Sequence, residues 1–309
     1  MIMRSLLFLL LAILALSCET VIPIDIETQE GALVINGTLR PGRYLWLDLS
    51  ESADPLDDAN IWNPPTIYDA LIDIYEVDEN GNSSYIGSCA QPLTDNDVYT
   101  YQSADSVFFE GRSYRVEVSL PDGRSAIATT ELPVSVTPTS FAITDTISLE
   151  GEDYVECELV FTDPELVDNR YSITLAVETG GSSGAVCFRS WEPDFVRTAG
   201  FYPDEAAQMP WYCETTYFRD TEFQGRERTI TTYVPIYYFI DYYSGGASDV
   251  LLYAFLNTPS VAHYEYAVSS RLQDITSGNP FAQPAAVYSN VEGGLGVFTG
   301  ISSQFILAD

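Results

Sequence analysis

The sequence contains no lysine, so all 13 of its basic residues are arginines. Aspartate and glutamate together number 45. The resulting formal charge of −32 repels nucleic acid and anionic lipid headgroups, because each phosphate contact would have to overcome like-charge repulsion. The charge therefore argues against a nucleic-acid-binding protein. The simplest interpretation of so acidic a surface is strong hydration.

Histidine is almost absent as well, since His263 is the only one. A Ser–His–Asp triad would have to use it, and no nucleophile motif such as GxSxG lies next to it in the sequence. We interpret His263 as a surface or helix-capping residue. Zinc chemistry has little support either, because the sequence has no CxxC motif. We therefore expect no cofactor and no catalytic residues.

Long hydrophobic runs are missing except for one at the start, Leu6–Leu16, which is too short to span a bilayer as a stable helix. Arg4 precedes the run, and the run ends in the letters ALSC, residues 15–18. This arrangement resembles a lipobox, in which a signal peptidase cuts before a lipid-modified cysteine. We expect residues 1–17 to be a lipoprotein signal peptide and residues 18–30 a tether. The alternatives are an ordinary secretory signal or a short anchor.

Four cysteines remain once Cys18 is assigned to lipid, an even number that outside the cytoplasm suggests disulfides. Four cysteines allow three pairings. We favour Cys187–Cys213, because the two flank one compact, turn-rich segment. The pairing Cys89–Cys157 follows only by elimination and would connect the two domains predicted below.

The first half of the chain shows the alternation of apolar and polar residues that is typical of β-strands. Turn signals separate the alternating segments: Asn80-Gly81 marks a tight hairpin, and Pro121–Arg124 marks another. Strands at this spacing predict an antiparallel β-sandwich of the immunoglobulin or fibronectin kind over residues 31–132. Residues 133–140 include two prolines and no charge, and we expect them to be a linker.

Residues 141–309 form a second β-rich region with one helix. The helix is expected near 260–276, where apolar residues recur at three- and four-residue spacing and Ser260 is a candidate N-cap. Residues 189–210 lack periodicity and are interpreted as a long loop. The tyrosine-rich run over 233–243 fits a strand with aromatics on both faces better than a binding platform. The fold class is therefore mainly β, with two sandwich domains.

Two acidic clusters are candidate calcium sites, although neither has the spacing of an EF-hand loop. Solvated acidic loops are the simpler interpretation, because acids dominate this surface anyway. The candidates are Asp163, Glu165 and Asp168 in the first cluster, and Asp54, Asp57 and Asp58 in the second.

The segment from Asn279 to Gly300 is rich in glycine and proline. A phosphate-binding loop would need a strand before it and a helix after it, whereas here the order is reversed. We instead expect the prolines to end the helix and Gly293-Gly294 to let the chain turn into its last strand.

The same segment, NPFAQP followed by VYSNVEGGLGVF, resembles the C-terminal signature of an uncharacterised family of Bacteroidota outer-membrane lipoproteins, domain of unknown function 4249. Three other segments agree with the family in order: 33–37, 218–225 and 264–273. The sequence departs from the family pattern at Arg219, where serine is usual, and at Thr299, where glycine is common. The residues that carry the C-terminal signature are Asn279, Pro280, Phe281, Pro284, Asn290, Gly293, Gly294 and Gly296.

The resemblance implies a lipid-anchored protein of the outer membrane that accompanies a TonB-dependent receptor, the barrel that imports nutrients. It implies no catalytic residue. A non-enzymatic accessory or binding protein is thus the leading hypothesis. The alternatives are a hydrolase that uses paired carboxylates on glycans, and a surface adhesin.

Overall fold

The computed structural model describes residues 31–52, 65–90, 101–105, 107–179, 182–199, 214–239, 250–277, 283 and 285–309. Cys18, the segments predicted to be a signal peptide and a tether, and the second acidic cluster lie outside the described residues. Within these ranges no helix combines the length and the apolar character that crossing a membrane would require.

The chain is mainly β, with one α-helix, as predicted. The strands are β1 (Leu33–Leu39), β2 (Trp46–Glu51), β3 (Leu71–Val77), β4 (Ser83–Ala90), β5 (Tyr101–Ser103), β6 (Arg112–Ser119), β7 (Ser125–Leu132), β8 (Pro138–Leu149), β9 (Glu152–Thr162), β10 (Arg170–Thr179), β11 (Ser182–Val186), β12 (Val196–Ala199), β13 (Glu214–Arg219), β14 (Glu227–Pro235), β15 (Val250–Pro259), β16 (Val291–Glu292) and β17 (Leu295–Leu307). The helices are the 3-10 helix η1 (Ile236–Phe239) and α2 (Val261–Ser277).

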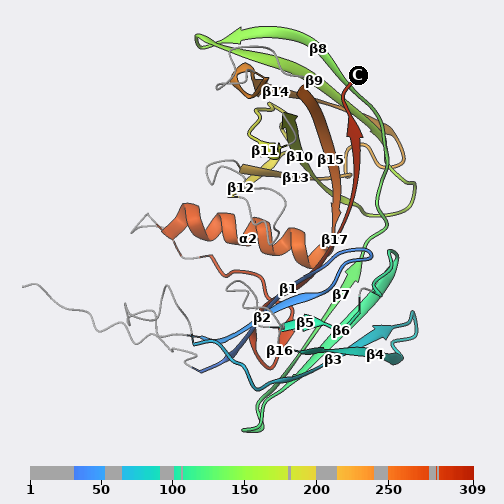
Figure 1. The fold of residues 1–309 in the computed structure, drawn as a ribbon, viewed down its shortest axis with the longest axis vertical. Coiled ribbons are helices and arrows are strands. Elements are labelled where there is room, and N and C mark those ends of the chain that lie inside the picture. The colour runs from blue at the N-terminus through green and yellow to red at the C-terminus, as the bar shows by residue number, and fades with distance from the viewer. Residues whose placement is uncertain are drawn as a thin grey trace, which may run out of the picture.

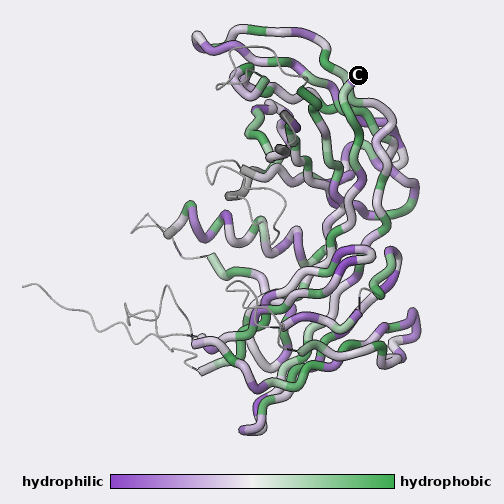
Figure 2. Tube along the Cα trace, viewed as in Figure 1, coloured by the Kyte–Doolittle hydropathy of each residue, from purple (hydrophilic) through white to green (hydrophobic). Residues whose placement is uncertain are grey.

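One large sheet runs through the whole molecule in the order β12-β13-β10-β15-β17-β1-β2-β5-β4-β3-β6-β7-β16, with β11 beside β10. A second sheet has the order β14-β9-β8. Figure 1 shows a curved molecule in which β1–β7 and β16 form the lower part, β8–β15 form the upper part, and α2 lies on the concave side between them. Figure 2 shows hydrophobic and hydrophilic residues mixed along the strands. In β7, buried and exposed residues alternate one by one, which is the two-residue period of a half-buried strand.

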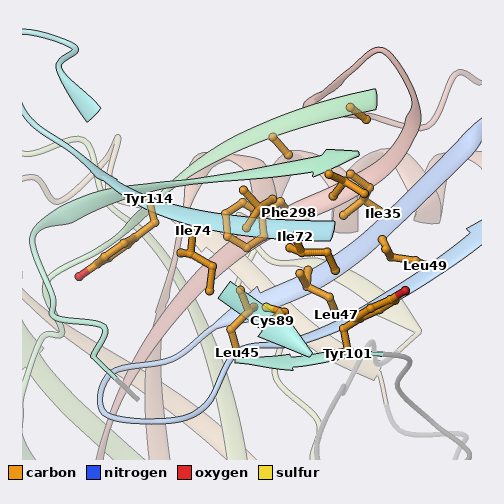
Figure 3. Close-up of a cluster of buried hydrophobic side chains, with 14 of the residues drawn as sticks. Ile35, Leu45, Leu47, Leu49, Ile72, Ile74, Cys89, Tyr101, Tyr114 and Phe298 are labelled. Carbon is orange, nitrogen blue, oxygen red and sulfur yellow. The ribbon is translucent and has the colours of Figure 1, made fainter. Parts of the chain in front are cut away.

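The lower part closes around one hydrophobic core. Its residues come from β1–β7 and the turns between them, and Phe298 of β17 joins them in the centre of the cluster (Figure 3). Figure 3 also shows Ile35, Ile72 and Leu47 pointing into this cluster from three different strands. The upper part has its own core, in which the small sheet packs on β10 and β15. Ile306, near the end of β17, packs against this second core.

Strand β17 therefore contributes to both parts, and this differs from the predicted organisation. The prediction placed residues 31–132 and 141–309 in separate sandwiches, but β17 pairs with β1 along its first half and with β15 along its second. The β1–β17 pair is parallel, whereas a purely antiparallel arrangement was expected. The predicted linker 133–140 overlaps the first residues of β8, which begins at Pro138.

The glycines of the C-terminal signature allow β16 and β17 to cross the lower part at close range. Gly293 has a φ of +80°, so the predicted turn into the last strand is confirmed. Gly296 has a φ of +97°, and a side-chain carbon there would collide with the carbonyl oxygen of Ile35. Asn290 fixes the crossing, because its side chain bonds Phe298 N at 2.9 Å and the carbonyl oxygen of Thr129 at 2.9 Å. These signature residues are structural, whereas Asn279, Pro280, Phe281 and Pro284 lie outside the described residues.

Other local predictions can be compared with the strands directly. Both hairpin turns are confirmed: Asp78 N bonds the carbonyl of Asn82, and Leu120 N bonds the carbonyl of Arg124. The loop expected over 189–210 is wrong in part, because β12 lies within it; a four-residue strand is too short to show a period.

Candidate functional site

The predicted helix places His263 in the interior, so the expected surface position is wrong. Ser260 caps the helix as predicted, accepting a hydrogen bond from His263 N at 3.2 Å. The imidazole Nε2 lies 2.9 Å from the hydroxyl of Tyr217, and Nδ1 lies 3.4 Å from Oγ1 of Thr299. Burial, with a smaller effect of the positive charge on Arg40, lowers the pKa of His263 to about 4. The imidazole is therefore neutral at pH 7 and joins α2 to the sheet.

Two of the cysteines are buried free thiols, so the predicted Cys89–Cys157 disulfide is wrong. The reason is that Cys89 belongs to the lower core and Cys157 to the upper one. Burial raises the pKa of each thiol to about 12, which leaves almost no thiolate to act as a nucleophile at neutral pH. Cys187 is disulfide-bonded, but Cys213 lies outside the described residues, so their pairing stays a prediction.

The three acids considered for calcium do not converge, and the described residues contain no group of three or more side chains able to hold a metal ion. Asp163 is buried and accepts hydrogen bonds from Tyr171 Oη at 2.5 Å, Asn169 Nδ2 at 3.2 Å and Gly225 N at 2.8 Å. Asp168, in contrast, lies at the surface and pairs with Arg170 at 3.1 Å. Asp163 is therefore the anchor of its loop.

A second buried carboxylate fixes the other end of this loop. Asp220 Oδ2 accepts the backbone N–H of Asn169 at 2.7 Å, and burial raises the pKa of Asp220 above its usual value. Phe223 packs into the upper core, with its ring 5.9 Å from that of Phe161. Residues 218–225, one of the segments that resembles the family, thus hold residues 163–169 in place.

This anchored loop forms one wall of a pocket of about 410 Å³ between the two cores. The other walls come from the start of β6, the end of β7 with the two residues after it, and the end of β15. The lining residues are Gly111, Arg112, Ser113, Glu131, Leu132, Pro133, Val134, Pro164, Val167, Asp168, Asn169, Arg170, Thr258 and Pro259. We call it the junction pocket. Its volume lies in the lower part of the range of small-ligand sites, about 300–1,000 Å³.

The charged groups of the junction pocket are mostly paired. Arg112 binds both carboxylate oxygens of Glu76, at 2.9 and 2.8 Å. Arg170 is buried and contacts the carbonyl and the carboxylate of Asp168, each at 3.1 Å. Glu131 is exposed and, among the described residues, forms no ion pair; its Oε1 accepts only the N–H of Val261, at 3.4 Å. The pocket thus contains one carboxylate without a cation.

Four exposed apolar side chains belong to the lining or lie close to lining residues. Val134 is 62% exposed and Val167 49% exposed, and both line the pocket. Leu166, next to Val167, is 95% exposed and has a φ of +65°. Phe109 is 56% exposed and lies under the guanidinium of Arg112, 5.0 Å from its ring centre. We call these four residues the apolar rim.

The left-handed backbone at Leu166 is unfavourable for a branched side chain, at a cost of about 1–2 kcal/mol. The buried carboxylates on either side hold it there. Backbone strain of this kind is found where a side chain is presented for function. The arrangement suits binding, because a rigid pocket with an apolar rim loses little conformational entropy when it is filled.

Two walls of this pocket come from segments for which the sequence suggests other roles. The proline-containing segment after β7 was interpreted as a linker, and the loop with Asp168 as a calcium candidate. Neither interpretation predicts that the two segments are close in space, because their proximity depends on how the two cores meet. The only local signals in these two segments are the prolines of 133–140 and the acidic residues of the loop with Asp168.

A family model described as "Domain of unknown function (DUF4249)" matches residues 19–304. No curated protein matches the sequence. Among solved structures, bovine butyrophilin is similar at 14% identity and a TM-score of 0.18, covering 72% of this chain and 87% of its own. Trypsin-activated alpha-2-macroglobulin from Escherichia coli is similar at 12% identity and a TM-score of 0.20, covering 77% of this chain and 15% of its own. Scores this low carry no argument about fold or function.

Proposed function

The chain belongs to the family described as domain of unknown function (DUF4249), and on that premise we propose that it is a lipid-anchored binding protein of the cell envelope. In this proposal Cys18 carries the lipid at the outer membrane. The partner is the barrel of a TonB-dependent nutrient transporter. The role is to hold that partner or its cargo, without chemistry of its own.

The junction pocket is the observation that carries the proposal. It is concave, lies between two cores, and has an apolar rim, which are common features of binding sites. Proline residues at positions 133, 164 and 259 line it, and their fixed φ angles keep the walls rigid.

The reactive groups of the described residues support a binding role as well. The only histidine is buried, neutral and bonded to Tyr217 and Thr299. The free thiols of Cys89 and Cys157 are buried in the cores. Each of these groups has a structural role in packing, and none of them lines the pocket.

Co-purification from mildly solubilised membranes tests the proposal. The tagged, full-length protein should recover a β-barrel transporter in stoichiometric amount, identified by mass spectrometry, and the mature N-terminus should carry acyl chains. A Cys18→Ala variant is the control: it should leave the membrane fraction and lose the barrel. Repeated recovery without a barrel, or turnover of a glycan by the purified chain, would contradict the proposal.

A further inference from the structure

We infer that the junction pocket receives an arginine or lysine side chain from a loop of a partner protein, an inference that deepens the proposed function and rests on it. The apolar rim would contact the aliphatic part of that side chain. Glu131 would receive its charged end.

The local charges favour a cation. Three arginines lie in or beside the pocket, Arg112, Arg170 and Arg219, and the first two are held by Glu76 and Asp168. Arg219 lies 4.0 Å from Asp168, and its guanidinium lies over the ring of Tyr264. Four acids also lie in or beside the lining, since Glu110 and Glu131 join Glu76 and Asp168. The whole chain carries a formal charge of −32, so its overall field attracts cations.

Glu110 cannot easily replace Glu131 in this role, because it already has a structural partner. Its Oε2 accepts both the backbone N–H and the hydroxyl of Ser135, at 2.9 and 3.0 Å. These bonds hold the chain that carries Val134 against the start of β6. Glu131, by contrast, makes one long contact with Val261 N. It is the carboxylate with free acceptor capacity at the pocket.

The shape of the site fits an amphipathic side chain. Lysine and arginine bury their methylene stems along apolar surface while the charge stays with water or a carboxylate. Val134 and Val167 offer such a surface from two different segments of the lining, and Glu131 lines the same pocket. Leu166, held out by its left-handed backbone, would contact the loop that carries the basic residue. A purely apolar anchor would leave Glu131 without a cation.

Methyl NMR of the full-length protein in detergent micelles tests the inference with two defined peptides. One is acetyl-Gly-Leu-Arg-Gly-amide, and the other has citrulline, the neutral isostere, in place of arginine. The arginine peptide should shift the methyl signals of Val134 and Val167 saturably. The citrulline peptide should bind about two- to five-fold more weakly, as expected for the loss of one exposed charge pair.

Glu131→Gln is the informative variant, since it removes the charge and keeps an acceptor for Val261 N. It should abolish the difference between the two peptides. Glu79→Gln is the matched control, because Glu79 is an exposed acid in the β3–β4 turn and does not line the pocket. It should preserve the difference.

Absence of methyl shifts at Val134 and Val167, or equal affinity for both peptides in the unmodified protein, would overturn the inference. These outcomes differ from failure of the proposed function. If the barrel co-purifies but the peptides do not bind, the pocket assignment is wrong and the envelope role stands. If the arginine peptide binds but no barrel co-purifies, the pocket assignment stands and the transporter association is wrong.

Discussion

Protonation of His263 should control the stability of this protein in mildly acidic solution. The pKa of the buried imidazole is lowered to about 4, whereas an unfolded histidine titrates near 6.5. The unfolded chain therefore binds the extra proton first as the pH falls, and the free energy of unfolding decreases between pH 6.5 and 4. The contribution of the neutral His263 to the free energy of unfolding is fully present above pH 6.5. The loss amounts to about 2 kcal/mol between pH 7 and 5, and about 3 kcal/mol once both states are protonated.

Comparison with His263→Gln isolates this effect from the many carboxylates. The amide can still bond Tyr217, and it does not titrate. Urea unfolding of both proteins at pH 7, 6 and 5 gives the free energies. The variant should be less stable at pH 7, and the difference should shrink by about 2 kcal/mol at pH 5. Parallel pH profiles would refute the reasoning, because they would mean that His263 is hydrated or already charged in the folded protein.

Two further predictions concern the close approach of β17 to β1 at Gly296 and the buried thiols of Cys89 and Cys157. Gly296→Ala should destabilise the protein by more than about 2 kcal/mol in thermal unfolding, because its φ is +97° and the new methyl would meet the carbonyl of Ile35. Gly42 has a φ of +63° with open space around it, so Gly42→Ala should lower the stability by only about 1 kcal/mol. Equal losses of stability in the two variants would argue against the close approach at Gly296. Iodoacetamide should leave Cys89 and Cys157 unmodified in the native protein and alkylate both after unfolding, since each thiol is buried with its pKa raised to about 12. Rapid native labelling of either thiol would contradict that burial.

Alternation and turn chemistry were enough to predict much of the fold. The segment over 70–77 alternates cleanly and forms β3, and Asn80-Gly81 forms its hairpin turn. The helix was predicted almost to the residue, because Ser260 caps it and its apolar spacing is regular. These signals are local, so they survive whatever the tertiary packing does.

Long-range pairing could not be predicted in the same way. Nothing near Val34 or Leu295 indicates that they are partners in a parallel pair. The same limit applies to the candidate site, because its walls come from four segments that are distant in sequence. His263 shows the limit for a single residue: its spacing places it on a helix, but only the packed sheet determines that it is buried.

The position of β17 has a consequence for how the protein is made. Val34 pairs with Leu295, so the first strand has no partner on that side until nearly the whole chain has emerged. The lower core also waits for Phe298, which fills its centre, and the upper one for Ile306. Synthesis from the N-terminus thus produces two incomplete cores, and a single late segment completes both. A chain that ends before residue 295 would leave both cores incomplete. Quality-control proteases could then recognise such a chain by this single defect.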